Sequence, residues 1–131
     1  LNDWWWKLYS DAYGVHPVQA PYRMVQALLG FKVAAEKAMA ANGGKKPTPE
    51  QLAAALKGSE WESPAGRIRM ALSDGHQAIQ DTAIGRTKYD PKKKMVTLVD
   101  IQRFPAECVN PPAGVKGEEW IKGGFQGAKC P

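Results

Sequence analysis

Three residue types of a nucleophilic relay stand together in one short stretch, at Ser73, Asp74 and His76. In hydrolases with such a relay the serine attacks, the histidine takes its proton and the aspartate orients the histidine. Residues crowded into a single turn cannot adopt that geometry, because their side chains diverge from adjoining backbone positions. Aspartate and Gly75 are also common turn formers. The stretch therefore predicts a turn, with no catalytic residues.

Other catalytic or metal-binding patterns are missing from the sequence. His16 and His76 follow no metal-ligand spacing such as His-Glu-x-x-His, and the chain has neither a GxGxxG nor a GxxxxGK phosphate loop. Cys108 and Cys130 do not form a Cys-x-x-Cys pair, so zinc or thioredoxin-like chemistry is not indicated. We therefore expect a protein that is not an enzyme and that binds neither a metal nor a cofactor.

The composition is that of a soluble globular domain. A chain of 131 residues, 44% hydrophobic, can form about one domain with a modest core. No apolar run approaches the ~20 residues of a membrane-spanning helix. The net charge is +5, but the only dense basic run is 92–94, which is predicted to form a hairpin turn. Because phosphate binding needs basic residues on one face, we expect a solvated loop and no nucleic-acid partner.

The first half of the chain predicts helices over 2–13, 22–41 and 49–57. Asn2 or Asp3 is expected to cap the first helix, and Gly14 to end it. The broad apolar stripe of 22–41 predicts packing against a sheet. Thr48 and Gln51 form the pattern of a capping box before the third helix. The tryptophans at 4–6 cannot share one helix face, which leaves either core packing or a stacking platform for bases or sugars.

The second half predicts strands near 66–70, 82–89 and 95–103. The first two are expected to be joined by a turn, with Gly85 marking a bulge or a close backbone approach. The third is apolar on both faces, which favours a buried strand of a layered α/β fold. From Pro105 onward, proline and glycine predict irregular coil anchored by Trp120 and Phe125.

The order of three motifs identifies a resemblance. Gly66-Arg67-Ile68-Arg69 is followed by Asp74-Gly75-His76-Gln77 and then by Ile84-Gly85-Arg86. Together with the helix 22–41, this order resembles the C-terminal part of type I periplasmic solute-binding proteins of branched-chain amino-acid ABC transporters. The resemblance covers the chain to about Phe104. Because that family's chains are far longer, it implies a C-terminal fragment of a two-lobed α/β fold. The start at Leu1 agrees with a processed or trimmed product.

The resemblance also implies an arrangement and a function. Residues 1–14 and 87–131 would be pieces of one lobe, and 15–86 a piece of the other, with hinge crossings at 15–21 and 82–86. The two lobes would capture a small carboxylate-bearing ligand (a branched-chain amino acid, an amide or an aromatic acid) in the periplasm. They would then deliver it to the membrane permease. The alternative is a basic interaction module that binds nucleic acid or an acidic partner.

The first crossing supplies the ligand-binding residues that the resemblance implies. His16 would pair with a ligand carboxylate, Gln19 would hydrogen-bond it, and Tyr22 would stack or donate its hydroxyl. Each has a structural alternative: a capping histidine, a solvated glutamine and a core tyrosine. Pro17 stands where some relatives carry an aromatic residue, so the ligand's identity stays open. With half of the clamp missing, we expect these 131 residues alone not to bind the ligand.

Two further expectations depend on the resemblance. In an exported protein Cys108 and Cys130 would form one disulfide that pins the C-terminal tail, stabilising it by about 3 kcal/mol. In a reducing compartment they would remain free thiols. Truncated sheets expose edges that favour pairing with a second copy, so a homodimer is expected.

Overall fold

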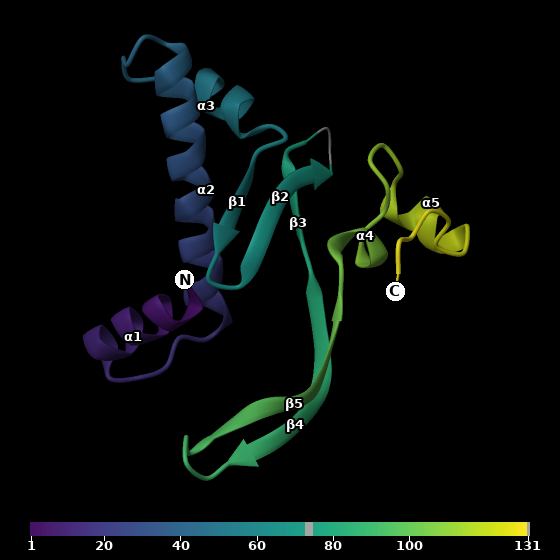
Figure 1. Cartoon of the computed structure of the whole chain (residues 1–131). Coiled ribbons are helices and arrows are strands. Elements are labelled where there is room, and N and C mark those ends of the chain that lie inside the picture. Colours follow the sequence, from purple (N-terminus) through teal and green to yellow (C-terminus); the bar gives the residue numbers. More distant parts are fainter. Residues whose placement is uncertain (73–74, 131) are drawn as a thin grey trace. The chain divides into compact units, whose positions relative to one another are not determined.

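The computed structural model describes residues 1–72 and 75–130 and has a mixed α/β fold with small antiparallel sheets (Figure 1). The chain forms two compact units, Leu1–Gln80 and Asp81–Pro131. Each unit is described by itself. Among the described residues, the first unit contains three helices and a three-stranded sheet, and the second contains a two-stranded sheet and two short helices.

The first unit begins with α1 (Asn2–Tyr13), α2 (Gln19–Ala41) and α3 (Pro49–Leu56). Gly14 ends α1 in the left-handed conformation, with φ of 68°, as predicted. The capping box of α3 is also confirmed. The predicted cap at Asn2 or Asp3 is wrong, because Leu1 holds the N-cap position and no side chain bonds there. Helix α2 begins before Tyr22, since Pro21 fits in a first turn whose amides lack helical partners.

The sheet of this unit has the order β1–β2–β3, formed by Glu60–Ser63, Gly66–Leu72 and Gln77–Gln80. Trp61 pairs with Ile68 across β1 and β2, and Met70 pairs with Ala78 across β2 and β3. The predicted connection of β2 to the strand at 82–89 is therefore wrong. The turn predicted at Ser73 and Asp74 lies outside the described residues.

The first unit has a small core cluster between α2 and α3. Ala34 and Ala38 of α2 pack against Ala55 of α3, with Leu52 and Leu56 partly buried beside them. Small residues on both helices permit this close packing. The buried side of the sheet carries larger apolar side chains: Ile68, Met70, Leu72 and Ile79.

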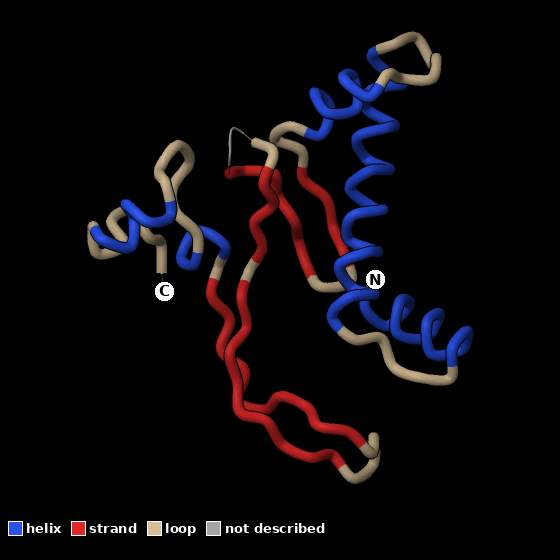
Figure 2. Tube along the Cα trace, turned by 180° about the vertical axis from the view of Figure 1, so that it is seen from behind, coloured by secondary structure: helices blue, strands red, loops and turns tan. Residues whose placement is uncertain are grey.

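The second unit begins with the ribbon formed by β4 (Thr82–Asp90) and β5 (Met95–Phe104) (Figure 2). Gly85 lies at a register shift, and a Cβ there would lie 2.8 Å from the carbonyl oxygen of Val99. The predicted bulge with close backbone approach is thus confirmed. The burial expected for 95–103 is wrong. Among the described strands β5 pairs with β4 alone, and Val96 is 60% exposed.

The C-terminal tail is more ordered than the predicted irregular coil. It contains α4 (Ala106–Val109) and α5 (Gly117–Lys122). Trp120 is buried, meets Phe125 edge-on at 5.1 Å and donates from Nε1 to the carbonyl oxygen of Gln126 at 2.9 Å. A disulfide joins Cys108 to Cys130. The aromatic contact, the Trp120 hydrogen bond and the disulfide thus all contribute to holding the tail.

Candidate functional site

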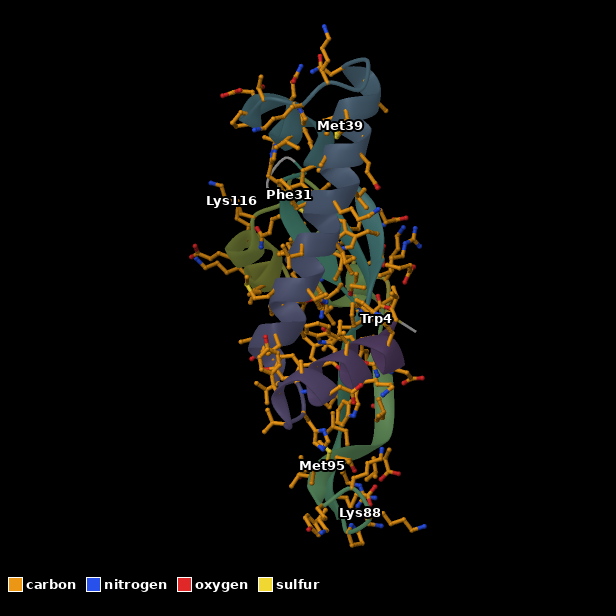
Figure 3. All side chains as sticks on the ribbon, turned by 90° about the vertical axis from the view of Figure 1, so that its left-hand side faces the viewer. Trp4, Phe31, Met39, Lys88, Met95 and Lys116 are labelled. Carbon is orange, nitrogen blue, oxygen red and sulfur yellow. A yellow bond between two sulfur atoms is a disulfide. The ribbon has the colours of Figure 1, made fainter. Side chains whose placement is uncertain are left out.

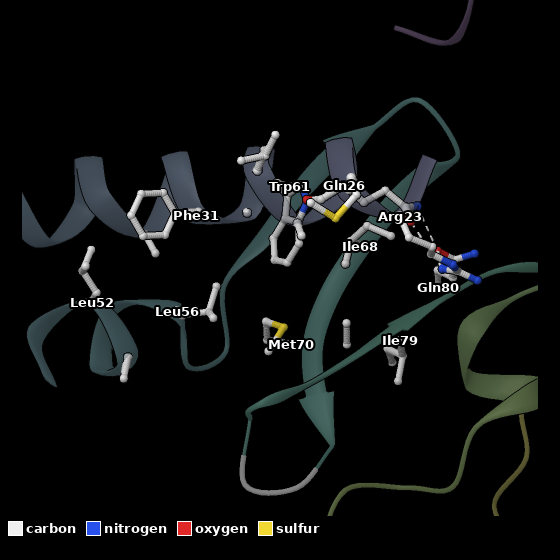
Figure 4. Close-up of a pocket in the computed structure, with 17 residues that line it drawn as sticks. Arg23, Gln26, Phe31, Leu52, Leu56, Trp61, Ile68, Met70, Ile79 and Gln80 are labelled. Carbon is white, nitrogen blue, oxygen red and sulfur yellow. Dashed lines mark hydrogen bonds between the residues drawn. The ribbon is translucent and has the colours of Figure 1, made fainter. Parts of the chain in front are cut away.

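The first unit contains an apolar groove of about 660 Å³ between α2, α3 and the sheet (Figure 4). This volume lies within the ~300–1,000 Å³ range of small-molecule sites. Leu52 and Leu56 of α3 lie at one end of the groove, and Arg23 and Gln80 lie at the other. The space between is lined by apolar side chains from both layers: Met24, Leu28, Phe31, Trp61, Ile68, Met70 and Ile79.

The floor and the rim of this groove differ in exposure. Ile68 on the floor is 4% exposed, whereas Leu28 and Phe31 on the helix are 62% and 58% exposed. The same helix also leaves Met24 exposed. Contiguous exposed apolar surface of this kind marks binding surfaces in soluble proteins. The groove can therefore accept an apolar group against a preformed floor.

A polar cluster closes one end of the groove. Arg23 Nη1 donates to Gln80 Oε1 at 2.9 Å and, at 3.3 Å, to Oε1 of Gln26. The Gln26 amide, which is buried, donates from Nε2 to Gln80 Oε1 at 3.0 Å and to Ser63 Oγ at 3.2 Å. These bonds link α2 to β1 and β3. They also hold one cation at the mouth of an otherwise uncharged space.

Trp61 fixes the position of β1 on α2. Its Nε1 donates to the carbonyl oxygen of Gln26 at 3.0 Å, and its ring lies against Gly30. Because glycine has no side chain, the indole reaches the helix backbone at this point. This contact holds β1 against α2 beside the groove.

Of the three predicted ligand residues, His16 contacts the first helix. Its ring stacks on Trp6, with centroids 4.3 Å apart, and its Nδ1 lies 3.4 Å from Ser10 Oγ. Gln19 is the first residue of α2 and is exposed. His16 therefore has a structural contact in this structure, while the Gln19 side chain is open to solvent.

Tyr22 also contacts the first helix. Its hydroxyl donates to Asn2 Oδ1 at 2.6 Å, and its ring meets Trp5 edge-on at 6.5 Å. Partial burial, and to a smaller extent the nearby Asp3 carboxylate, raises the pKa of the Tyr22 hydroxyl above its ordinary value. The hydroxyl therefore stays protonated as a donor. None of His16, Gln19 and Tyr22 lines the groove.

The three successive tryptophans have different surroundings. Trp5 packs against Tyr9 at 5.5 Å as well as against Tyr22, and Trp6 is covered by His16. Trp4 is 51% exposed. Trp4 also contacts Trp5, with ring centroids 6.2 Å apart, but it keeps the most exposed position of the three.

The other sequence patterns do not converge on this groove. His76 is exposed, and Ser73 and Asp74 fall outside the described residues. Within 1–72 and 75–130, no group of three or more His, Cys, Asp or Glu residues is placed to hold a metal ion. The lysines 92–94 lie in the turn between β4 and β5, where Asp90 Oδ1 accepts from the amides of Lys92 and Lys93. The hairpin turn predicted at 92–94 is thus confirmed, and the Asp90 carboxylate shapes it.

The polar end of the groove is the part that the sequence pattern did not reveal. Arg23 and Gln26 interrupt the apolar helix at a spacing of three, which is a weak signal on its own. Their partner Gln80 stands 57 and 54 residues further along the chain. Only the packing of β3 beside β2 brings the three together.

Comparison with known proteins adds no relationship: no protein-family model matches this chain, and no curated protein sequence matches it. In the described part of the chain, no helix is long and apolar enough to cross a membrane.

Proposed function

We propose that the chain is the C-terminal portion of a type I solute-binding protein serving an ABC importer in the periplasm. Its ligand is a small carboxylate-bearing solute, namely a branched-chain amino acid, an amide or an aromatic acid. The two lobes close on the solute and present it to the membrane permease. The motif order from Gly66 to Arg86 motivates this assignment, and the fold is compatible with it as a mixed α/β architecture.

The main observation in support is the boundary between the two compact units. It falls between Gln80 and Asp81, directly before the proposed crossing at 82–86. If the chain crosses from one lobe to the other at 82–86, a new compact unit is expected to begin close to these residues. The resemblance also places residues 1–14 in the same lobe as 87–131. In the structure α1 belongs to the first compact unit, Leu1–Gln80. That part of the lobe assignment depends on the resemblance alone.

A second observation concerns the compartment. The disulfide between Cys108 and Cys130 is of the kind that persists in the periplasm and other oxidising environments.

The test uses the protein as its gene encodes it, titrated calorimetrically with leucine, a short aliphatic amide and benzoate. Saturable one-to-one binding of one class is expected, and no heat is expected from residues 1–131 alone. His16→Phe keeps a ring on Trp6 but removes both ring nitrogens, so it should weaken binding without unfolding the protein. Gln19→Ala should also weaken binding, and the exposed Gln102→Ala on β5 is its matched control. If the gene-encoded protein binds none of these solutes, the proposal fails.

The basic hairpin favours a second candidate, an interaction module for nucleic acid or an acidic partner. Lys88 lies on the β4–β5 ribbon near Met95 (Figure 3), and 92–94 form its turn. Tyr89 beside them is 58% exposed. Salt-sensitive retention on heparin, lost when 92–94 are changed to glutamine, would favour this candidate over solute capture.

A further inference from the structure

We propose that the groove of the first unit binds a linear alkyl carboxylate, a free medium-chain fatty acid, independently of the solute captured between lobes. The groove is preformed, with a buried apolar floor at Ile68, Met70 and Ile79. All the residues that line it belong to α2, α3 and the sheet of the first unit. The site therefore needs no movement of one unit against the other.

The shape of the groove selects an elongated ligand. Its lining on α2 runs from Arg23 to Ala34. At 1.5 Å per residue this is a length of roughly 16 Å, about that of an extended dodecyl chain. Leu52 and Leu56 bound the far end, and they offer only apolar atoms to the end of such a chain.

The charge of the groove selects a carboxylate as the head group. Of the described residues that line it, Arg23 is the one that carries a charge. Among the described residues, Arg23 donates to Gln26 and Gln80, in both cases from Nη1. Its Nε and Nη2 are therefore left for a ligand. A guanidinium binds a carboxylate through two parallel N–H donors. Gln26 and Gln80 hold this side chain at the polar end of the groove.

An ammonium or a zwitterionic ligand fits less well. No described lining residue is acidic, so a positive group in the groove would lose its hydration without gaining a partner. A neutral apolar ligand would leave Arg23 unused. The alkyl carboxylate is the ligand class that uses both ends of the groove.

The test is calorimetric titration of the full chain with octanoate, decanoate and dodecanoate below their critical micelle concentrations. One-to-one binding is expected, tightening by up to about fourfold for each added methylene. Decanol should bind more weakly than decanoate by at most about fivefold, because Arg23 is exposed. Arg23→Gln should abolish this difference, whereas Lys37→Gln on the same helix should leave it unchanged.

A second variant tests the place of binding. Ala27 lines the groove and is exposed, so Ala27→Phe should fill the space and abolish decanoate binding without unfolding the protein. Ala40→Phe, on an exposed part of α2 outside the groove, is the matched control. Binding that survives Ala27→Phe, or that ignores chain length, would overturn the proposal. The proposal would also be overturned if decanoate does not bind and sedimentation shows a dimer that Leu28→Asp disrupts. A second copy of the chain would then occupy the groove.

Discussion

Gly30 and Trp61 meet so closely that a Cβ on Gly30 would lie 2.5 Å from Cζ2 of the indole. Glycine in a helix interior is ordinarily less favourable than alanine by about 1 kcal/mol. Here the missing side chain allows the Trp61 ring to pack on the helix backbone. From this position the indole N–H donates to the carbonyl oxygen of Gln26. The contact joins helix and sheet in the first unit.

Gly30→Ala should therefore destabilise the protein, although alanine is the better helix former. Overpacking costs about 1–3 kcal/mol, which exceeds the gain in helix propensity. Urea unfolding measures the change. In a Trp61→Leu background the same substitution should become neutral or stabilising, because the clash is gone. An unchanged effect of Gly30→Ala in the two backgrounds would contradict the assigned contact.

Gln26→Leu should cost about 1–3 kcal/mol of stability. Its buried amide donates to Ser63 and Gln80 and accepts from Arg23, so leucine removes bonds that join three segments. Ser63 Oγ keeps its bond to the carbonyl oxygen of Gly66, which limits the loss. Gln19→Leu at the exposed start of the same helix is the control. Chemical denaturation that gives equal stabilities for the two variants would argue against the network.

Thr48→Ala should destabilise α3 by about 1 kcal/mol, because the N-cap oxygen that accepts from the Gln51 amide is lost. Thr48→Ser keeps that oxygen and should be nearly neutral. The loss should appear as faster amide exchange in the first turn of α3. Equal protection in the alanine and serine variants would show that the cap does not stabilise the helix.

The same cap has a consequence for acid sensitivity. Hydrogen bonding to its own backbone amide, and then to the Thr48 side chain, lowers the pKa of Glu50 below its ordinary value. A carboxyl with a lowered pKa in the folded state contributes stability above the unfolded pKa, and loses it as pH falls through the folded pKa. Thr48→Ala should therefore raise the pKa of Glu50 in an NMR titration. A pKa that does not move would refute the Thr48 contribution.

Replacing Cys108 and Cys130 by serine should destabilise the tail by about 3 kcal/mol, the chain-entropy value for a loop of 22 residues. The near-ultraviolet signal of Trp120 should weaken, since Phe125 and the Gln126 carbonyl would no longer be held beside it. Reduction of the wild-type protein should give the same spectrum. A wild-type signal in the double variant would mean that Trp120 alone orders the tail.

Features set by neighbours in sequence were predictable, and features set by distant partners were not. Gly14 and the Thr48–Gln51 box mark helix ends through local chemistry, and both predictions hold. The strand β1 was not predicted, although Glu60 and Glu62 alternate with Trp61 in a strand pattern. Its partner depends on a register that no local signal specifies.

The groove also combines features that were predictable from the local sequence with features that were not. The apolar stripe of α2 was visible in the sequence, and it predicted a sheet as partner. The polar cluster was not, because Gln80 reaches Arg23 only through the β2–β3 pairing. The apolar residues on both sides of β5 predicted burial, yet Val96 and Leu98, which share one face of the strand, are exposed. Alternation alone does not reveal how many layers cover a strand.

The bond between Cys108 and Cys130 also determines how the protein responds to cleavage. Lys116 and Lys122 lie inside the loop that it closes. A single cut by a lysine-specific protease at either residue would leave both pieces covalently joined. The mass would rise only by one water molecule, and two peptides would separate only after a reducing agent was added. A nicked tail could thus pass unnoticed on a non-reducing gel.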